Sequence, residues 1–303
     1  MKRVIVRLCL GLLIVVLCVA AVFAVSPGAR TRAFIATYRV WDFHLPFAGG
    51  KTVADRLTGS YCPFVPIQVE LEPSMTMTLD PCDLVTREIL LHHTWEPETT
   101  KVVASHLRAG GTFVDVGAHV GWYTLKAAQL VGPKGHVIAV EPNPETLVRL
   151  FDNVRSSGVG GIVVVAPVAS SDSEGTLTLY AAPRENTGES SLASGNAAQG
   201  GGTAVPYQVR ARRLDDIVRE AHVGPVDMIK IDVEGAEFTV LKGAVETLDR
   251  DRPVLSVELL DPQLKQMGSS VAEVQAFLSA HGYVPTVQRE DNTIFLPVTA
   301  RKP

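Results

Sequence analysis

The sequence has no surplus of positive charge. Its 303 residues include 28 Lys and Arg residues against 32 Asp and Glu residues, so the formal net charge is -4 at pH 7. The two signs are intermixed along the chain, and no stretch resembles the basic face that contact with a nucleic-acid backbone needs. We therefore expect no nucleic-acid partner.

Cysteine is scarce, and no His or Cys residues stand at the spacings typical of zinc sites. Cys9 and Cys18 lie in an apolar segment, where a thiol behaves as a small apolar side chain. Cys62 and Cys82 could pair in an oxidising compartment, but two isolated cysteines are more often free thiols. We expect free thiols here and keep the disulfide as the alternative.

Only one long apolar run is present, from Leu8 to Val25, and it follows a short basic segment. Crossing a bilayer takes roughly 17 to 25 apolar residues, whereas a cleaved signal has a shorter core and a small-residue exit site. Residues 22–24 would serve as that exit. We expect residues 1–25 to form a hydrophobic helix that anchors the chain by a single pass, with membrane contact through residues 8–25. The alternative is export after signal cleavage. Basic residues lie on both sides of the run, so either face of the membrane is allowed.

Residues 26–66 have no sustained periodicity and predict a juxtamembrane linker with one short helix. The domain proper is expected at residues 67–300. Within it, Phe113–Val116 predicts a buried strand, residues 117–121 a turn, the stretch up to Val131 a helix, and His136–Glu141 a second strand. Such a βαβ unit places two parallel strands side by side.

The same alternation continues to the end of the chain. Helices are expected at 144–156, from 236 onward and at 271–280, strands at 162–165, 228–233 and 254–258, and a closing strand pair near 283 and 294. The pattern predicts an α/β fold: a Rossmann-like, doubly wound, mostly parallel sheet with an antiparallel C-terminal strand pair. The segment 182–203, rich in Gly, Ser, Asn and Ala, is expected to bury little and to form a surface loop or lid over the site.

The turn after the first parallel strand carries the clearest functional signal. Gly117 and Gly121 can adopt backbone angles closed to other residues and let the chain approach a ligand. Amide groups at the start of the following helix suit a carboxylate, and Asp115 at the strand tip suits an ammonium group. Glu141 ends the second strand, where a carboxylate can receive both hydroxyls of a ribose. Together these residues predict a nucleoside-bearing cofactor.

The spacing of the turn distinguishes between cofactors. A nicotinamide cofactor needs three glycines to make room for its pyrophosphate, and the third is missing here. Asp115, an acid shortly before this turn, would repel a pyrophosphate but would attract the ammonium group of S-adenosylmethionine. Two alternatives remain, a nicotinamide-dependent oxidoreductase and a non-catalytic, membrane-tethered binding module on the same fold.

A second cluster of charged residues lies in the segment 229–237. Lys230, Asp232 and Glu234 share one face of a strand by its period of two. Charges in the middle of a covered sheet are costly, so Asp232 and Glu234 are expected at or past the end of the strand, in the ligand crevice.

Taken together, the segments from about Leu79 to Leu296 resemble the FkbM-type methyltransferases. The resemblance rests on residues 95–97, 115–118, 141–143, 214–216, 229–243 and 257–258, of which 229–237 is the most specific part. It implies S-adenosylmethionine as the methyl donor and an oxygen atom, often a hydroxyl of a sugar or natural product, as the acceptor. It also places Ala118, His119, Asn143 and Asp232 beside the cofactor, although the family commonly has Asn where this chain has His119.

Methyl transfer to a hydroxyl is an in-line displacement that requires alignment of the two groups and a proton acceptor. Our hypothesis assigns the proton acceptor to Asp232 or Glu234, with Glu96 and Glu258 as reserves. No metal requirement is expected, although clustered carboxylates can hold Mg²⁺. The acceptor is expected to be a small molecule or a glycan, such as a sugar, a glycolipid or a natural product.

Overall fold

The computed structural model describes residues 26–44, 62–199 and 202–298, which belong to two compact units. One unit comprises Met1–Val69 and Thr78–His93, and the other comprises Glu70–Met77 and Thr94–Pro303. The apolar segment predicted at residues 1–25 lies outside the described residues. Among the residues that are described, no helix is both long enough and apolar enough to cross a membrane. Membrane attachment through residues 8–25 therefore stays a prediction.

The first unit contains α2 (Pro27–His44) and α4 (Leu84–His92). The Asp83 side chain caps α4 by accepting a hydrogen bond from the Thr86 N–H at 2.9 Å. In the described part of the predicted linker, α2 is longer than the one short helix expected, since it spans 18 residues. Its Thr31 is buried and hydrogen-bonded to the backbone of Val65.

The same unit corrects the expectation of free thiols. Cys62 and Cys82 form a disulfide, with their Cα atoms 5.7 Å apart, a separation typical of such bonds. Sequence spacing carries no information on this distance, which depends on how residues 62–66 fold back toward α4. The disulfide, which we kept as the alternative from the sequence, is the form that the structure shows.

A two-stranded sheet is formed by β1 (Ile67–Glu72) and β2 (Met75–Leu79), and the division between the units passes through both strands. The second unit is built on a seven-stranded sheet with the order β11-β12-β10-β9-β3-β4-β5. Its parallel strands are β3 (Thr112–Val116), β4 (His136–Val140), β5 (Val163–Ala166), β9 (Met228–Ile231) and β10 (Val254–Glu258). The antiparallel pair is β11 (Tyr283–Arg289) and β12 (Asn292–Pro297), with β12 antiparallel to β10. The predicted α/β architecture is confirmed.

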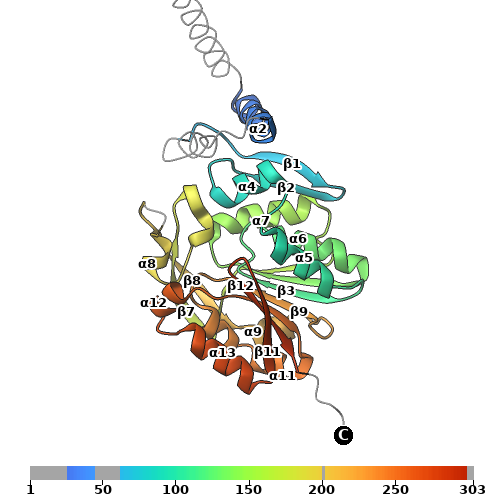
Figure 1. Cartoon of the computed structure of the whole chain (residues 1–303), viewed down its shortest axis with the longest axis vertical. Coiled ribbons are helices and arrows are strands. Elements are labelled where there is room, and N and C mark those ends of the chain that lie inside the picture. The colour runs from blue at the N-terminus through green and yellow to red at the C-terminus, as the bar shows by residue number, and fades with distance from the viewer. Residues whose placement is uncertain (1–25, 45–61, 200–201, 299–303) are drawn as a thin grey trace, which may run out of the picture. The chain divides into compact units, whose positions relative to one another are not determined.

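Helices cover both faces of this sheet, as a doubly wound fold requires. In Figure 1, α5 (Pro97–His106), α6 (Trp122–Val131) and α7 (Pro144–Ser156) lie on one side, and α9 (Leu214–Glu220), α11 (Val245–Asp251) and α13 (Val271–Ala280) lie on the other. The short helices are η1 (Gly132–Lys134), α10 (Glu237–Lys242) and α12 (Asp261–Gln266). The core between the layers consists of branched apolar side chains such as Val114, Ile138, Ile229 and Leu255, each 0% exposed.

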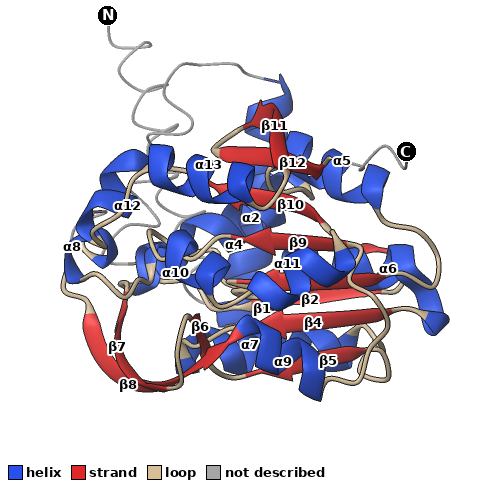
Figure 2. Ribbon diagram, turned by 90° about the horizontal axis from the view of Figure 1, so that it is seen from below, coloured by secondary structure: helices blue, strands red, loops and turns tan. Residues whose placement is uncertain are grey.

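A three-stranded sheet was not predicted. It consists of β6 (Ala169–Ser171), β8 (Val205–Arg213) and β7 (Gly175–Ala181), and Figure 2 shows β7 and β8 as a curved ribbon beside the main sheet. Between β7 and β8 the chain forms η2 (Arg184–Glu189) and α8 (Ser194–Ala197). The expectation that this segment buries little was wrong, because Thr187, Ser191, Asn196 and Ala197 are all at most 3% exposed. Small side chains permit this close packing.

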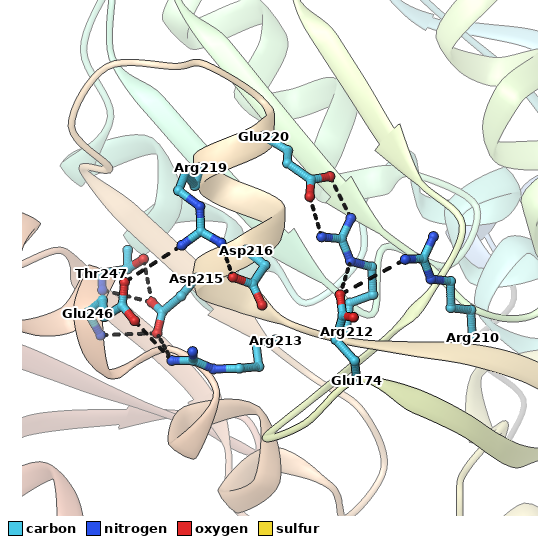
Figure 3. Close-up of polar contacts among 10 residues, drawn as sticks. All are labelled: Glu174, Arg210, Arg212, Arg213, Asp215, Asp216, Arg219, Glu220, Glu246 and Thr247. Atoms are coloured by element: carbon cyan, nitrogen blue, oxygen red, sulfur yellow. Dashed lines mark hydrogen bonds and ion pairs between the residues drawn. The ribbon is translucent and has the colours of Figure 1, made fainter.

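Asp215 joins α9 to the start of α11, and Figure 3 shows the charged residues around it. Ala244 at the start of α11 offers no capping side chain. Instead, the buried Asp215 carboxylate accepts hydrogen bonds from the N–H groups of Glu246 at 3.1 Å and Thr247 at 2.8 Å. It also pairs with Arg213 at 2.9 Å. Asp215, part of the family resemblance, is thus a structural residue.

Replacing Asp215 with Ala should lower the free energy of unfolding by about 3 kcal/mol, because two helix N–H groups lose a charged acceptor. The neighbouring Asp216 provides a matched control, since its ion pair with the exposed Arg219 is a surface pair that contributes about 1 kcal/mol or less. Urea unfolding of the D215A and D216A variants measures the difference. Equal midpoints would contradict the capping role.

Candidate active site

Four acidic side chains lie at the carboxyl ends of neighbouring parallel strands. Asp115 lies near the end of β3, Glu141 directly follows β4, Asp232 directly follows β9, and Glu258 ends β10. Parallel strands end at one edge of a sheet, which is where ligands bind in open α/β folds. The predicted position of Asp232 and Glu234 past the end of their strand is confirmed, since β9 ends at Ile231.

The glycine turn after β3 has the predicted backbone angles but a different reason for its glycines. Gly117 has φ +85° and Gly121 has φ +95°. A Cβ atom on Gly117 would lie 1.7 Å from the carbonyl oxygen of Asp232, and one on Gly121 would lie 2.7 Å from Leu150 Cδ1. The glycines are therefore required by packing against this chain itself. Ala118, also predicted to contact the cofactor, is buried, and its N–H donates to the Val140 carbonyl at 3.1 Å.

Glu141 connects the glycine turn to the start of α7. One carboxylate oxygen accepts the His119 N–H at 2.8 Å, and the other accepts the Asn143 N–H at 2.8 Å and the Thr146 hydroxyl at 3.0 Å. Burial raises the pKa of Glu141 despite these donors. A carboxylate has about four acceptor positions, so this geometry leaves room for one further donor rather than the two ribose hydroxyls expected.

The segment 182–199 contacts the turn directly. His119 Nε2 is hydrogen-bonded to Thr187 Oγ1 at 2.7 Å, and the Asn143 side-chain amide donates to Ser190 Oγ at 3.1 Å. The side-chain oxygen of Asn143, Oδ1, meanwhile caps α7 by accepting the Glu145 N–H at 2.9 Å. The predicted lid therefore covers the predicted cofactor residues and holds His119 and Asn143 in fixed positions.

A buried Lys–Asp pair lies beside Asp115. Lys230 is 2% exposed, and its Nζ donates to Asp232 Oδ2 at 2.6 Å and lies 4.6 Å from the centre of the Tyr123 ring. Burial opposes the charge, but the carboxylates around it, first that of Asp232, raise the pKa of Lys230 above its ordinary value. Burial raises the pKa of Asp115 to about 6, even though Lys230 and a 2.6 Å hydrogen bond from the Thr124 hydroxyl lower it.

Glu96 joins this group from a loop before α5. It accepts hydrogen bonds from the Tyr123 hydroxyl at 2.6 Å and from the side-chain amide of the fully buried Asn292 at 3.4 Å. Burial raises the pKa of Glu96. Tyr123 and Asn292 were not predicted, because neither belongs to a motif and both reach the site only through the tertiary fold.

Glu234 lies on the other side of Asp232, in a tight turn with φ 54°. Its backbone carbonyl accepts hydrogen bonds from Ser191 Oγ at 2.7 Å and Asn196 Nδ2 at 2.8 Å, and its side chain accepts one from Gln263. Burial and the nearby Asp232 charge raise the pKa of Glu234 well above its ordinary value. Glu258, a reserve candidate, is 7% exposed and its pKa is raised by the same causes.

The residues fit a nucleoside cofactor that carries an ammonium group. The raised pKa of Asp115 reflects a buried carboxylate whose negative charge is only partly balanced, and a ligand ammonium would stabilise it. Glu141 offers its remaining acceptor position to a hydroxyl. The aliphatic and aromatic neighbours of the turn, Val120, Trp122 and Tyr123, are buried and keep it rigid.

An acid at the tip of the first parallel strand, a glycine turn and a second acid after the next strand define the class of α/β enzymes that bind nucleoside cofactors. Within that class, residues 115–285, more than half of the chain, match the family described as Methyltransferase FkbM domain. The chain belongs to this family. Membership confirms the enzyme class and the cofactor predicted from the sequence, a methyltransferase that uses S-adenosylmethionine.

Individual relatives share only a modest part of their sequence with this chain. Hexuronic acid methyltransferase AglP of Haloferax volcanii is 27% identical over 153 residues, which cover 50% of this chain and 58% of the relative. The 31-O-demethyl-FK506 methyltransferase FkbM of Streptomyces tacrolimicus is 28% identical over 210 residues, 62% of this chain and 78% of the relative. The crystal structure of methyltransferase FkbM from Methylobacillus flagellatus is 18% identical, with a TM-score of 0.43, and covers 70% of this chain and 52% of that one.

Proposed function

We propose that the protein transfers a methyl group from S-adenosylmethionine to a hydroxyl oxygen of a sugar, glycolipid or natural product. The observation that carries this proposal is the group of carboxylates next to the glycine turn, which supplies proton acceptors beside the cofactor residues. Two relatives support the acceptor class by their names, one a hexuronic acid methyltransferase and the other a 31-O-demethyl-FK506 methyltransferase.

In this proposal the donor is held by residues already in place. Asp115 pairs with the ammonium group, Glu141 accepts a ribose hydroxyl, and the segment that carries Thr187 and Ser190 covers both. When bound, S-adenosylmethionine supplies an electrophilic methyl group. The remaining work of this chain is to align the acceptor, to exclude water and to receive a proton.

The proton acceptor is proposed to be Asp232 or Glu234. Asp232 is the more exposed of the pair formed with Lys230, with 21% of its side chain accessible, so an acceptor can reach it. Desolvation and the nearby carboxylates raise the pKa of Glu234 well above its ordinary value, so it holds a proton more readily than an exposed glutamate does. Glu96 and Glu258 remain reserves, since Glu96 already accepts hydrogen bonds from Tyr123 and Asn292.

Calorimetric titration of the full chain in detergent with S-adenosylhomocysteine tests the cofactor site. We expect micromolar binding to the wild type, and about 100-fold weaker binding to a D115N, E141Q double variant, because each change removes a charged acceptor. E145Q, which changes an exposed acid on α7 whose side chain accepts a hydrogen bond from Tyr207, is the matched control. Binding of NADH in place of the thioether, or of neither ligand, would contradict the proposal.

Turnover is tested with labelled S-adenosylmethionine and a panel of hydroxylated sugars and glycolipids. D232N and E234Q should each lower the rate of methyl transfer. The decrease should be about 10²–10⁴-fold for the variant of the residue that takes the proton. If both variants keep near-normal turnover and affinity, the proton acceptor has been assigned wrongly. Cofactor binding without turnover on any acceptor would favour the non-catalytic binding module.

A further inference from the structure

Three carboxylates converge at the ends of β9 and β10. Asp232, Glu234 and Glu258 each offer an oxygen atom, and these three atoms all lie within 4.8 Å of one another. Asp232 and Glu234 are half-buried, and Glu258 is 7% exposed. Like charges so close together repel strongly in a medium of low dielectric constant. Bound protons can relieve this repulsion, and full ionisation of the three carboxylates requires more positive charge than the described residues supply at this point.

One oxygen of the cluster is buried without a hydrogen-bond partner among the described residues. Glu258 Oε2 is buried and accepts no hydrogen bond within the part of the chain that the structure describes. Buried carboxylate oxygens are almost always hydrogen-bonded or bound to a cation, because the lost hydration is otherwise uncompensated. Since Glu258 belongs to the converging group, its free oxygen is available to a ligand at that point.

The charges of the group leave a deficit of positive charge. Lys230 donates to one oxygen of Asp232, and the neutral Gln263 amide donates to one oxygen of Glu234. The second carboxylate oxygens of Asp232 and Glu234 accept no hydrogen bond from any described residue. Lys230 is the ammonium beside these carboxylates, and it also faces Asp115 and Glu96. It therefore cannot balance the three carboxylates when they are ionised, and a divalent cation would supply the missing positive charge.

We propose that Asp232, Glu234 and Glu258 bind a hard divalent cation of the Mg²⁺ or Mn²⁺ type. Carboxylate oxygens without histidine or cysteine are the donor set that these ions prefer, and Mg²⁺ keeps several waters that complete its shell. This proposal replaces our expectation from the sequence that no metal is required. The signal for it is tertiary, because Glu258 lies on a different strand from the other two acids.

The position of the cation gives it a role in catalysis. The backbone carbonyl of Asp232 packs against Gly117 of the glycine turn, so the cation site adjoins the residues that hold the donor. An acceptor hydroxyl that replaces one water of the cation would be held in place and would lose its proton more easily, and the proton would go to an oxygen of Asp232 or Glu234 that does not bind the cation. This last step rests on the proposed function, whereas binding of the cation does not.

The test is binding of the metal alone to the full chain in detergent after treatment with EDTA. Titration with MgCl₂ by calorimetry, and with MnCl₂ by electron paramagnetic resonance, should show one site and a release of protons, since the ligands must be deprotonated. E258Q should weaken binding at least tenfold. E174Q, which changes an exposed acid in the connection between β6 and β7, should bind like the wild type. No binding to the wild type, or unchanged binding to E258Q, would overturn the proposal.

The E258Q variant should fold, because an amide replaces a buried and unpaired carboxylate. In EDTA its melting temperature should equal or exceed that of the wild type, and added MgCl₂ should raise only the wild-type value. E234Q provides a second test, because it also removes a proposed ligand of the cation and should also weaken Mg²⁺ binding. Titration with S-adenosylhomocysteine separates the two proposals: thioether binding without metal binding would refute the cation site, and metal binding without thioether binding would refute the proposed function.

Discussion

Replacing Gly117 with Ala should lower the free energy of unfolding by about 4 kcal/mol or more and abolish cofactor binding. The added Cβ would lie 1.7 Å from the carbonyl oxygen of Asp232, and backbone atoms on both sides prevent easy relief. The φ of +85° adds strain for any residue with a side chain. The ends of β3 and β9 would have to separate, and with them the residues proposed to hold donor and acceptor.

Gly158 is the matched control for this substitution. Its φ is +69°, but a Cβ there would meet no atom within 4 Å. G158A should therefore lower the free energy of unfolding only by the cost of placing a side chain at a positive φ, about 1 kcal/mol. Urea unfolding followed by circular dichroism gives both values, and titration with S-adenosylhomocysteine gives the loss of binding. Equal unfolding midpoints for G117A and G158A would show that the turn tolerates the clash.

The metal-free protein should lose stability as the pH rises from about 4.5 to 7 in EDTA. Burial raises the pKa of Asp115 from 3.8 to about 6 and that of Glu237 from 4.5 to about 7. A carboxyl group whose pKa is raised by folding binds more protons in the folded state, so its stabilising effect is full below the unfolded pKa and is lost as the pH passes the folded pKa. At about 1.4 kcal/mol per unit, each group contributes on the order of 3 kcal/mol.

Chemical unfolding at several pH values between 4.5 and 7.5 measures this dependence. Carboxylates with lowered pKa values, such as Asp172 and Glu220 in ion pairs, act below this window and do not mask it. E237Q should flatten the upper part of the profile, and D115N the lower part. A stability that rises with pH over the same range would contradict the burial argument.

Local signals explain why the central fold could be predicted. The strand Thr112–Val116 is wholly buried, and the turn after it is marked by two glycines. The helix α7 begins at Pro144, directly after its cap Asn143, and both residue types favour a helix start. Each signal lies within a few residues of the element that it determines. The predicted bounds of α7 and α13 agree with the structure residue for residue.

The parts that were missed depend on contacts between distant residues. β8 carries the charged run Arg210 to Arg213, which is atypical of a strand, and its pairing with β7 spans a long connection. The site shows the same limit. Asp115, Glu141 and Asp232 were predicted from their motifs, whereas the pairing of Lys230 with Asp232 and the buried Glu258 oxygen without a partner among the described residues follow from strand register and burial.

The cover formed by residues 182–199 has a consequence for kinetics. It is hydrogen-bonded to the glycine turn through Thr187 and His119, and to the start of α7 through Ser190 and Asn143. A net hydrogen bond of this kind contributes about 1 kcal/mol, so both can be exchanged for contacts with a ligand at little cost. We expect the donor to enter, and its spent thioether to leave, when these bonds open, and we predict that release of the thioether limits the rate of turnover.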